Sequence, residues 1–365
     1  MRRAAVILLL LLAPLAQALC CTTAVVSAGA SADGRPLLWK QRDASDPFNI
    51  MARVSGGRYS YTGLFAVKDT LRRSCYGGIN EAGFALINNL SYNLRPDSLG
   101  FDVSNGAFMA RALASCRSVE DFERMLAAEP APRNLSANFG VADALGAAAY
   151  FEAGDSTFVR FDVPDGDILF RTNYSLSGDP ERGRGRERYL TMDYLTEPPG
   201  LFSPEFFFKT GRSYLKNGRD ALSGARGRLE EHDFIPRSTT VSGIVIECPV
   251  RERERGLIWC ATGYTPCCYA VAVVEGEELP GVVQGPANEV SRRLYDRVHD
   301  GKMVDAKALR RIIRGVERFE RREMRAARRL MRRGLTPGAG SEAVRSYNAS
   351  ADRRFRRFVL RTDGF

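Results

Sequence analysis

The first residues of the chain and the cysteine that follows them constrain this protein more than any other feature. Arg2 and Arg3 precede a continuous apolar run over residues 4–12, and small residues follow. A charged start with an apolar run of this length is typical of a secretory signal peptide and is too short for a transmembrane helix. We therefore expect residues 1–20 to be removed on export and Cys21 to lead the mature chain.

The small residues near the end of this segment leave two cleavage points open. Cleavage after Ala18 fits the small-x-small pattern better but keeps Leu19 and Cys20 ahead of Cys21, whereas cleavage after Cys20 exposes Cys21 directly. Lipoprotein processing needs a small residue before the modified cysteine, and Leu19 precedes Cys20. We expect an exported protein, periplasmic or extracellular, rather than a lipid-anchored one.

A leading cysteine carries a nucleophile and a base on one residue. The reference pKa of an α-amino group is about 7.7–8.0, close to the pH at which a general base works best. Histidine is nearly absent: His232 and His299 stand outside any recognisable nucleophile or metal motif, and we expect both at the surface. This scarcity favours a base other than imidazole.

The composition is that of an ordinary globular protein, with 44% hydrophobic and 26% charged residues. Of the eight cysteines, Cys20 belongs to the expected leader. Two interpretations of the other seven stay open: six pair in an oxidising compartment while Cys21 stays free, or several are buried thiols. No CxxC is matched by a second such motif, so we expect no metal site, and we expect no cofactor.

Residues 21–274 alternate between short apolar stretches and turn signals. The pattern predicts strands over 22–28, 36–39, 59–67, 84–88, 138–143, 147–152, 158–163, 168–172, 241–246, 257–262 and 269–274, and helices over 108–114 and 119–127. Many short strands with few helices between them predict a layered α+β domain. We expect this domain to cover residues 21–285.

The chain changes character near residue 285. Residues 305–333 have apolar positions at helical spacing and arginines on the other face, and a second basic helix is expected over 343–360. We therefore expect a basic helical extension over residues 286–365.

The net charge of +10 does not by itself identify a partner for this extension. We expect Glu317, Glu320 and Glu323 to pair with arginines of their own helix, because they are interleaved at helical spacing. No aromatic platform for bases accompanies the arginines. We thus expect a solvated face that makes at most a weak contact with an anionic surface, and no nucleic-acid partner.

Several separated stretches resemble one family. They are the CTT opening followed by ASADGRPLLWKQRD, then GGINEAGFALINN, ANFGVADALGAAAYFE, and RTNYS followed by RERY. Their order and spacing resemble the N-terminal-nucleophile (Ntn) cysteine hydrolases of the acyl-coenzyme A:6-aminopenicillanate acyltransferase type, which are related to choloylglycine hydrolases and cysteine dipeptidases. The resemblance covers about residues 21–274. It implies a four-layer αββα sandwich, which the Arg-rich helices would extend at the C-terminus.

The resemblance also implies catalytic residues at the start of the chain. Cys21 matches the nucleophile, and Asp43 matches the acidic residue that closes the segment Lys40-Gln41-Arg42-Asp43. The family's first arginine in this segment is Lys40 here. We therefore assign the cation to Arg42 instead.

Three further residues are implied by the later motifs. Asn88 matches the asparagine that helps to hold the oxyanion, with the adjacent Asn89 as the alternative. Asn173 in RTNYS matches a second active-site asparagine. Arg188 in RERY matches a later arginine, with Arg186 as the alternative.

The activity that the resemblance implies is acyl transfer from a small-molecule or peptide-like amide. The acyl group would pass to Cys21 as a thioester, and water or another amine would then take it. Two other functions stay open: a dipeptidase of the same superfamily, and a non-catalytic Arg-rich protein that binds surfaces. The sequence leaves the acyl group, the leaving amine and the oligomeric state undetermined.

Overall fold

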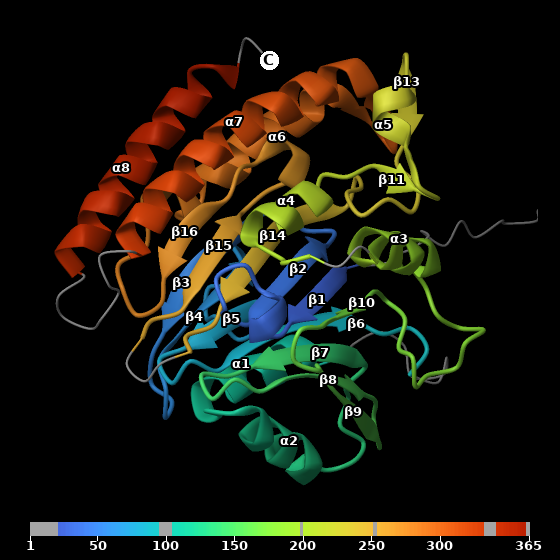
Figure 1. Cartoon of the computed structure of the whole chain (residues 1–365), viewed down its shortest axis with the longest axis vertical. Helices are drawn as coiled ribbons and strands as arrows, with labels where there is room; N and C mark the ends of the chain where they lie inside the picture. Colours follow the sequence, from blue (N-terminus) through green and yellow to red (C-terminus); the bar gives the residue numbers. More distant parts are fainter. Residues whose placement is uncertain (1–20, 95–103, 198–199, 251–253, 332–340, 363–365) are drawn as a thin grey trace, which may run out of the picture.

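Two antiparallel sheets lie face to face at the centre of the computed structural model (Figure 1). The structure describes residues 21–94, 104–197, 200–250, 254–331 and 341–362. The expected signal peptide, residues 1–20, lies outside the described residues.

The first sheet has Cys21 at the start of one of its inner strands. Its six strands run in the order β10-β1-β2-β14-β15-β16. Their bounds are Thr22–Val26 for β1, Leu37–Asp43 for β2, Ile168–Arg171 for β10, Thr240–Glu247 for β14, Leu257–Ala261 for β15 and Val271–Val274 for β16. Strands β1 and β2 are buried at every position, because the second sheet covers one face and helices cover the other.

The second sheet holds seven strands in sequence order. These are β3 (Asn49–Val54), β4 (Tyr61–Ala66), β5 (Gly77–Asn80), β6 (Ala85–Leu90), β7 (Ala137–Ala142), β8 (Ala148–Ala153) and β9 (Phe158–Asp162). Gly140 allows β7 to approach the first sheet, since a Cβ there would lie 2.7 Å from Val25 Cγ2. The close approach brings β6 and β7 against β1 and β2.

Helices cover the outer face of each sheet. Helices α6 (Pro286–Val298), α7 (Ala306–Met331) and α8 (Ser341–Val359) pack over the first sheet and share its core, and α1 (Asn105–Ser115) and α2 (Val119–Ala128) pack over the second (Figure 1). The predicted four-layer αββα sandwich is therefore confirmed. The division of the chain at residue 285 stays a prediction, although the helices beyond it form one of the four layers.

The connection from β10 to β14 and the turn after α6 carry short elements. They are α3 (Arg186–Thr196), α4 (Pro204–Thr210), α5 (Ala221–Gly224), β11 (Leu215–Lys216), β12 (Arg219–Asp220), β13 (Arg228–Glu230), β17 (His299–Asp300) and β18 (Met303–Asp305). Within the described part of the chain, no helix is both long and apolar enough to cross a membrane.

The glutamates of α7 do not all behave as the helical spacing suggested. Glu320 is buried and bonds Arg212, with 2.7 Å between Oε1 and Nη1. Glu323 is also buried and bonds Arg354 of α8 and the Tyr347 hydroxyl. Only Glu317 faces an arginine of its own helix, Arg321, at 3.9 Å. The expectation of ion pairs within the helix is therefore wrong for Glu320 and Glu323, because both point into the core.

The expectation that both histidines are surface residues is wrong for His299. Its side chain is 2% exposed, whereas that of His232 is 67% exposed. The His299 ring stacks on Tyr295 with centroids 3.7 Å apart, and its Nε2 lies 3.2 Å from Glu231 Oε2. The turn after α6 folds His299 back under the helix, which sequence spacing alone does not reveal.

The cysteines of the described residues are free thiols, and all seven are buried. This agrees with the second of the two interpretations above. Burial raises the pKa of Cys116 to about 11 and that of Cys75 to about 12. Both thiols are therefore poor nucleophiles near neutral pH.

Candidate active site

Cys21 stands at the start of β1, where the ends of neighbouring strands converge. It is 7% exposed, and its Sγ lies 3.9 Å from the main-chain oxygen of Asp43, the last residue of β2. Strand β1 pairs with β2 on one side and with β10 on the other. Residues that follow β2 and β10 are thereby brought to the thiol.

Arg188 in the first turn of α3 connects two of the predicted positions. Its Nη1 donates to the Cys21 main-chain oxygen and to Thr22 Oγ1, both at 2.7 Å, and its Nη2 donates to Asn173 Oδ1 at 3.0 Å. Gly185 precedes the helix with φ +84°, and a Cβ there would lie 2.2 Å from Arg188 Nη2. The alternative, Arg186, is exposed.

Asn173 is completely buried and uses both ends of its amide. Its Oδ1 accepts from Arg188, and its Nδ2 donates to the Leu90 main-chain oxygen at 2.6 Å. Asn173 therefore fixes Arg188 against the end of β6. It reaches Cys21 through that arginine rather than directly.

Lys40 and Asn88 form a buried pair between the two sheets. Lys40 Nζ donates to Asn88 Oδ1 at 2.7 Å and to the Tyr76 main-chain oxygen at 2.8 Å. An ammonium group only donates, so it fixes the Asn88 oxygen toward itself and turns Nδ2 away, where it can donate to another group. Burial is the main reason that the pKa of Lys40 falls to about 8; Cys21 opposes this fall, and Arg42 contributes to it.

Asn89 points to the other side of the strand. Its Nδ2 donates to the Thr172 main-chain oxygen at 2.5 Å. Successive side chains of a strand face opposite sides, so Asn88 and Asn89 cannot share one role. Of the two, Asn88 shares a cluster with Lys40, whose charge is felt at Cys21.

Asp43 lies buried beside the thiol in a polar cluster. Its Oδ1 accepts from Thr240 Oγ1 at 2.7 Å, and its Oδ2 lies 3.3 Å from Arg237 Nε. Burial raises the pKa of Asp43 to about 6, while the nearby Arg237 and Arg188 oppose that rise. Among the described residues, Oδ2 accepts no hydrogen bond, so a further donor can still be received there.

Arg42, the predicted cation, is committed elsewhere. Its Nη1 donates to Asn49 Oδ1 at 2.8 Å, and its guanidinium lies 3.8 Å from the centre of the Tyr76 ring. The cation beside Asn88 is therefore Lys40 and not Arg42, to which the sequence analysis assigned this role. The sequence does contain a signal for Lys40, because it stands where the resembled motif has its first arginine.

A polar cavity of about 400 Å³ adjoins this cluster. Its wall includes Ala44, which follows Asp43 in sequence, and Thr240, which pairs with Asp43 across the neighbouring strand. Tyr264, Asn288 and Lys302 also line the cavity. A cavity of this size accommodates a small organic group.

We expect replacement of Arg188 by Met to reduce both stability and activity. The change leaves the Cys21 oxygen and Asn173 Oδ1 without their buried donor, which costs about 3 kcal/mol. Urea denaturation and turnover of an amide substrate measure the two effects. Arg186→Met is the matched control, since Arg186 is exposed two residues away. Equal behaviour of the two variants would contradict the contacts described here.

Comparison with known protein families gives one match. Residues 58–188 match the family model of acyl-coenzyme A:6-aminopenicillanic acid acyl-transferase. No curated protein matches the chain.

Three solved structures are similar to this one at low sequence identity. An N-acylethanolamine-hydrolyzing acid amidase ortholog of Caenorhabditis elegans is 14% identical, with a TM-score of 0.44, covering 64% of this chain and 94% of its own. Penicillin V acylase of Agrobacterium tumefaciens is 16% identical, with a TM-score of 0.39, and the match covers 69% of this chain and 86% of that one. A conjugated bile acid hydrolase variant of Clostridium perfringens is 13% identical, with a TM-score of 0.40, covering 70% and 92%.

The family match begins before β4 and ends at Arg188 in the first turn of α3. It therefore includes three of the predicted site residues, Asn88, Asn173 and Arg188. Over residues 58–188 the chain is similar to the acyl-coenzyme A:6-aminopenicillanic acid acyl-transferase family.

Proposed function

We propose that this protein is an exported cysteine amidohydrolase or acyltransferase that cleaves a C–N amide bond through a thioester on Cys21. The observation that carries the proposal is the convergence of buried polar groups at one strand terminus. Arg188 bonds the Cys21 main chain, Asp43 lies against its thiol, and the charge of Lys40 reaches it. A cysteine that only fills space in the core does not require these polar and charged neighbours.

The first step requires a free α-amino group on Cys21. That amine takes the thiol proton while Sγ forms a bond to the substrate carbonyl carbon. Asp43 Oδ2, buried and able to accept a further hydrogen bond, would hold the resulting ammonium. An ion pair there would offset the cost of burying both charges.

The tetrahedral intermediate places a negative charge on the former carbonyl oxygen. Asn88 Nδ2, turned outward by Lys40, is the side-chain donor suited to that oxygen. Collapse breaks the C–N bond, and the ammonium returns its proton to the leaving amine. Water, or a second amine, then attacks the thioester carbonyl carbon while the α-amine of Cys21 takes its proton. The C–S bond breaks, the acid or the new amide leaves, and Sγ takes the proton back from the ammonium.

A trapping experiment tests this proposal. Acid quenching shortly after mixing with a slowly hydrolysed N-acyl amide should give protein that is heavier by the acyl group. Peptide mapping at acid pH, where the protonated α-amine cannot take the acyl group from Sγ, should place that mass on a peptide that begins with Cys21. Acylation of another residue, or an active enzyme that retains Leu19 and Cys20, would overturn the mechanism.

A further inference from the structure

The outer side of α7 and α8 is a continuous basic surface. We call it the arginine ridge and define it by its exposed cations, eight on α7 and four on α8. They are Lys307, Arg311, Arg314, Arg318, Arg321, Arg322, Arg325 and Arg329 on α7, and Arg345, Arg353, Arg356 and Arg357 on α8. The positions recur every three or four residues on α7, so these side chains share one face.

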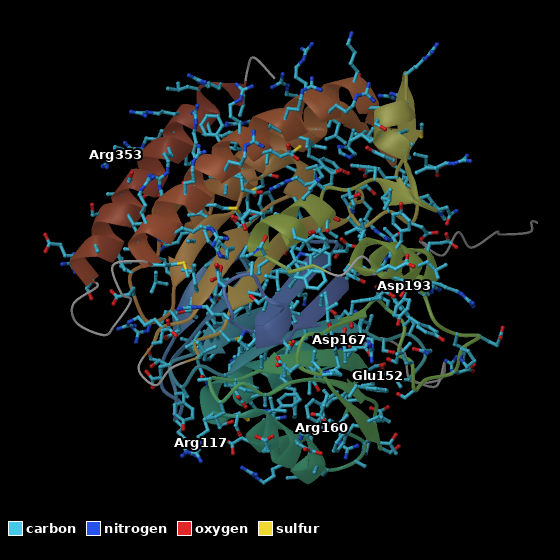
Figure 2. The ribbon with its side chains drawn as sticks, viewed as in Figure 1. Arg117, Glu152, Arg160, Asp167, Asp193 and Arg353 are labelled. Atoms are coloured by element: carbon cyan, nitrogen blue, oxygen red, sulfur yellow. The ribbon has the colours of Figure 1, made fainter. Side chains whose placement is uncertain are left out.

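The ridge is large and lies on two neighbouring helices. From Lys307 to Arg329 it runs for about 33 Å at the rise of an α-helix. Helix α8 packs alongside α7 (Figure 1). Nitrogen-tipped side chains, Arg353 among them, project from the outer side of the two helices (Figure 2).

Acidic side chains do not neutralise this surface. Glu320 and Glu323, the residues that could have compensated it, are turned inward to Arg212 and Arg354. Exposed or half-exposed acids on the two helices are Glu317, Glu342 and Asp352. Asp352 accepts from the main chain at Gly281 and Val282, which binds it to a neighbouring segment.

Three of the ridge cations differ from two other arginines of the same helix. Arg310 donates to main-chain oxygens of Leu222 and Ala225, and Arg328 bonds Asp33 and Glu205. In contrast, Arg311, Arg318 and Arg325 make no hydrogen bond, ion pair or ring contact with any residue that the structure describes. Arg310 and Arg328 therefore link parts of the fold, whereas Arg311, Arg318 and Arg325 can contact a partner outside the chain.

We propose that the arginine ridge docks the protein on an anionic phospholipid surface. Its cations lie on two adjacent helices, an arrangement that meets many headgroup phosphates at once, and guanidinium groups bond phosphate oxygens in pairs. A nucleic acid is disfavoured because the ridge has no exposed aromatic side chain on which bases could stack. Leu360 is the one large apolar side chain exposed near it among the described residues, so attachment is electrostatic rather than inserted.

Vesicle sedimentation with the processed full-length protein tests this inference. The protein should bind vesicles that contain phosphatidylglycerol and not vesicles of phosphatidylcholine alone, and salt should release it. The combined variant Arg311→Gln, Arg318→Gln, Arg325→Gln should bind about 100-fold more weakly. Glutamine keeps a good helix propensity, so circular dichroism and amide hydrolysis should stay as in the unmodified protein.

The matched control carries the same charge change elsewhere. Arg58→Gln, Arg73→Gln, Arg117→Gln removes three exposed arginines associated with the second sheet and its helices, and Arg117 lies at the opposite end of the molecule from Arg353 (Figure 2). This control should bind as the unmodified protein does. If both variants bind anionic vesicles equally weakly, the net charge of the protein and not the arginine ridge determines binding, and the proposal is overturned. Equal binding to zwitterionic vesicles, or tighter binding to duplex nucleic acid than to anionic vesicles, would also overturn it.

Discussion

Replacement of Cys21 by Ala should abolish amide cleavage, with a loss of at least about 10⁴-fold in kcat, because the variant lacks the atom that forms the acyl bond. Cys21→Ser should be nearly as inactive, since an alcohol with the same α-amine is much harder to deprotonate than a thiol. Both variants should keep the fold, because the Arg188 hydrogen bond goes to the main-chain oxygen of residue 21 and not to the side chain. Initial rates and thermal unfolding measure the two properties.

The control for this prediction is a second buried thiol. Cys116 follows α1 beneath the second sheet and is 3% exposed, compared with 7% for Cys21. Cys116→Ala should cost some stability through lost packing and leave the rate unchanged. If Cys21→Ala retains substantial turnover, the assignment of the nucleophile fails.

Lys40 should set the alkaline limit of activity. Its pKa of about 8 means that the ammonium is present below pH 8 and is lost as the pH rises through that value. Because that charge acts on Cys21 and fixes Asn88, kcat/KM should fall as the pH rises above about 8. Lys40→Arg should keep the charge and move the alkaline limb upward by at least about one pH unit, because a guanidinium stays protonated. Lys40→Met should lower kcat/KM by about 10²- to 10³-fold below pH 8, where the lysine of the unmodified enzyme is charged.

Lys68 provides the matched control for the lysine-to-arginine change. Its side chain is 73% exposed and faces Asp46 at 3.3 Å. Lys68→Arg should leave the pH profile of kcat/KM unchanged. An alkaline limb that stays in place in Lys40→Arg would show that another group titrates there.

Local sequence patterns predicted most of the regular elements. The strands of β7 and β8 and the helices α2 and α7 begin and end within about two residues of the expected positions. The alternation of side chains and the 3.6-residue period are properties of the backbone, so they can be read without tertiary contacts. Helix α6 was not expected, because the notable feature near residue 285 is a change of charge rather than a clear apolar period.

The pairing of strands required the structure. Strands β9 and β10 follow each other in sequence, but β9 is the edge of the second sheet, whereas β10 crosses to the first and pairs with β1. This crossing brings the segment with Asn173 to Cys21. Nothing in the sequence between residues 158 and 172 distinguishes the two strands, because both have ordinary strand patterns.

The candidate site divides in a similar way. The motifs indicated Cys21, Asp43, Asn88, Asn173 and Arg188, and the structure places Asp43 and Arg188 in direct contact with Cys21. Sequence reasoning assigned the cation to Arg42, whereas the structure pairs Arg42 with Asn49 and pairs Lys40 with Asn88. Both side chains leave β2 on the same face, so only their packing against the second sheet separates them.

By itself, the sequence determined which residues can carry chemistry and which segments form strands or helices, because spacing and residue type are local properties. Only the tertiary structure decided which of those residues meet, and which charges remain exposed. Glu320 and Glu323 show the reason most plainly. Their helical spacing suits them to arginines one turn away. Both glutamates instead point into the core and pair with arginines more than 30 residues away in sequence. The exposed arginines of α7 therefore lack these two glutamates as partners.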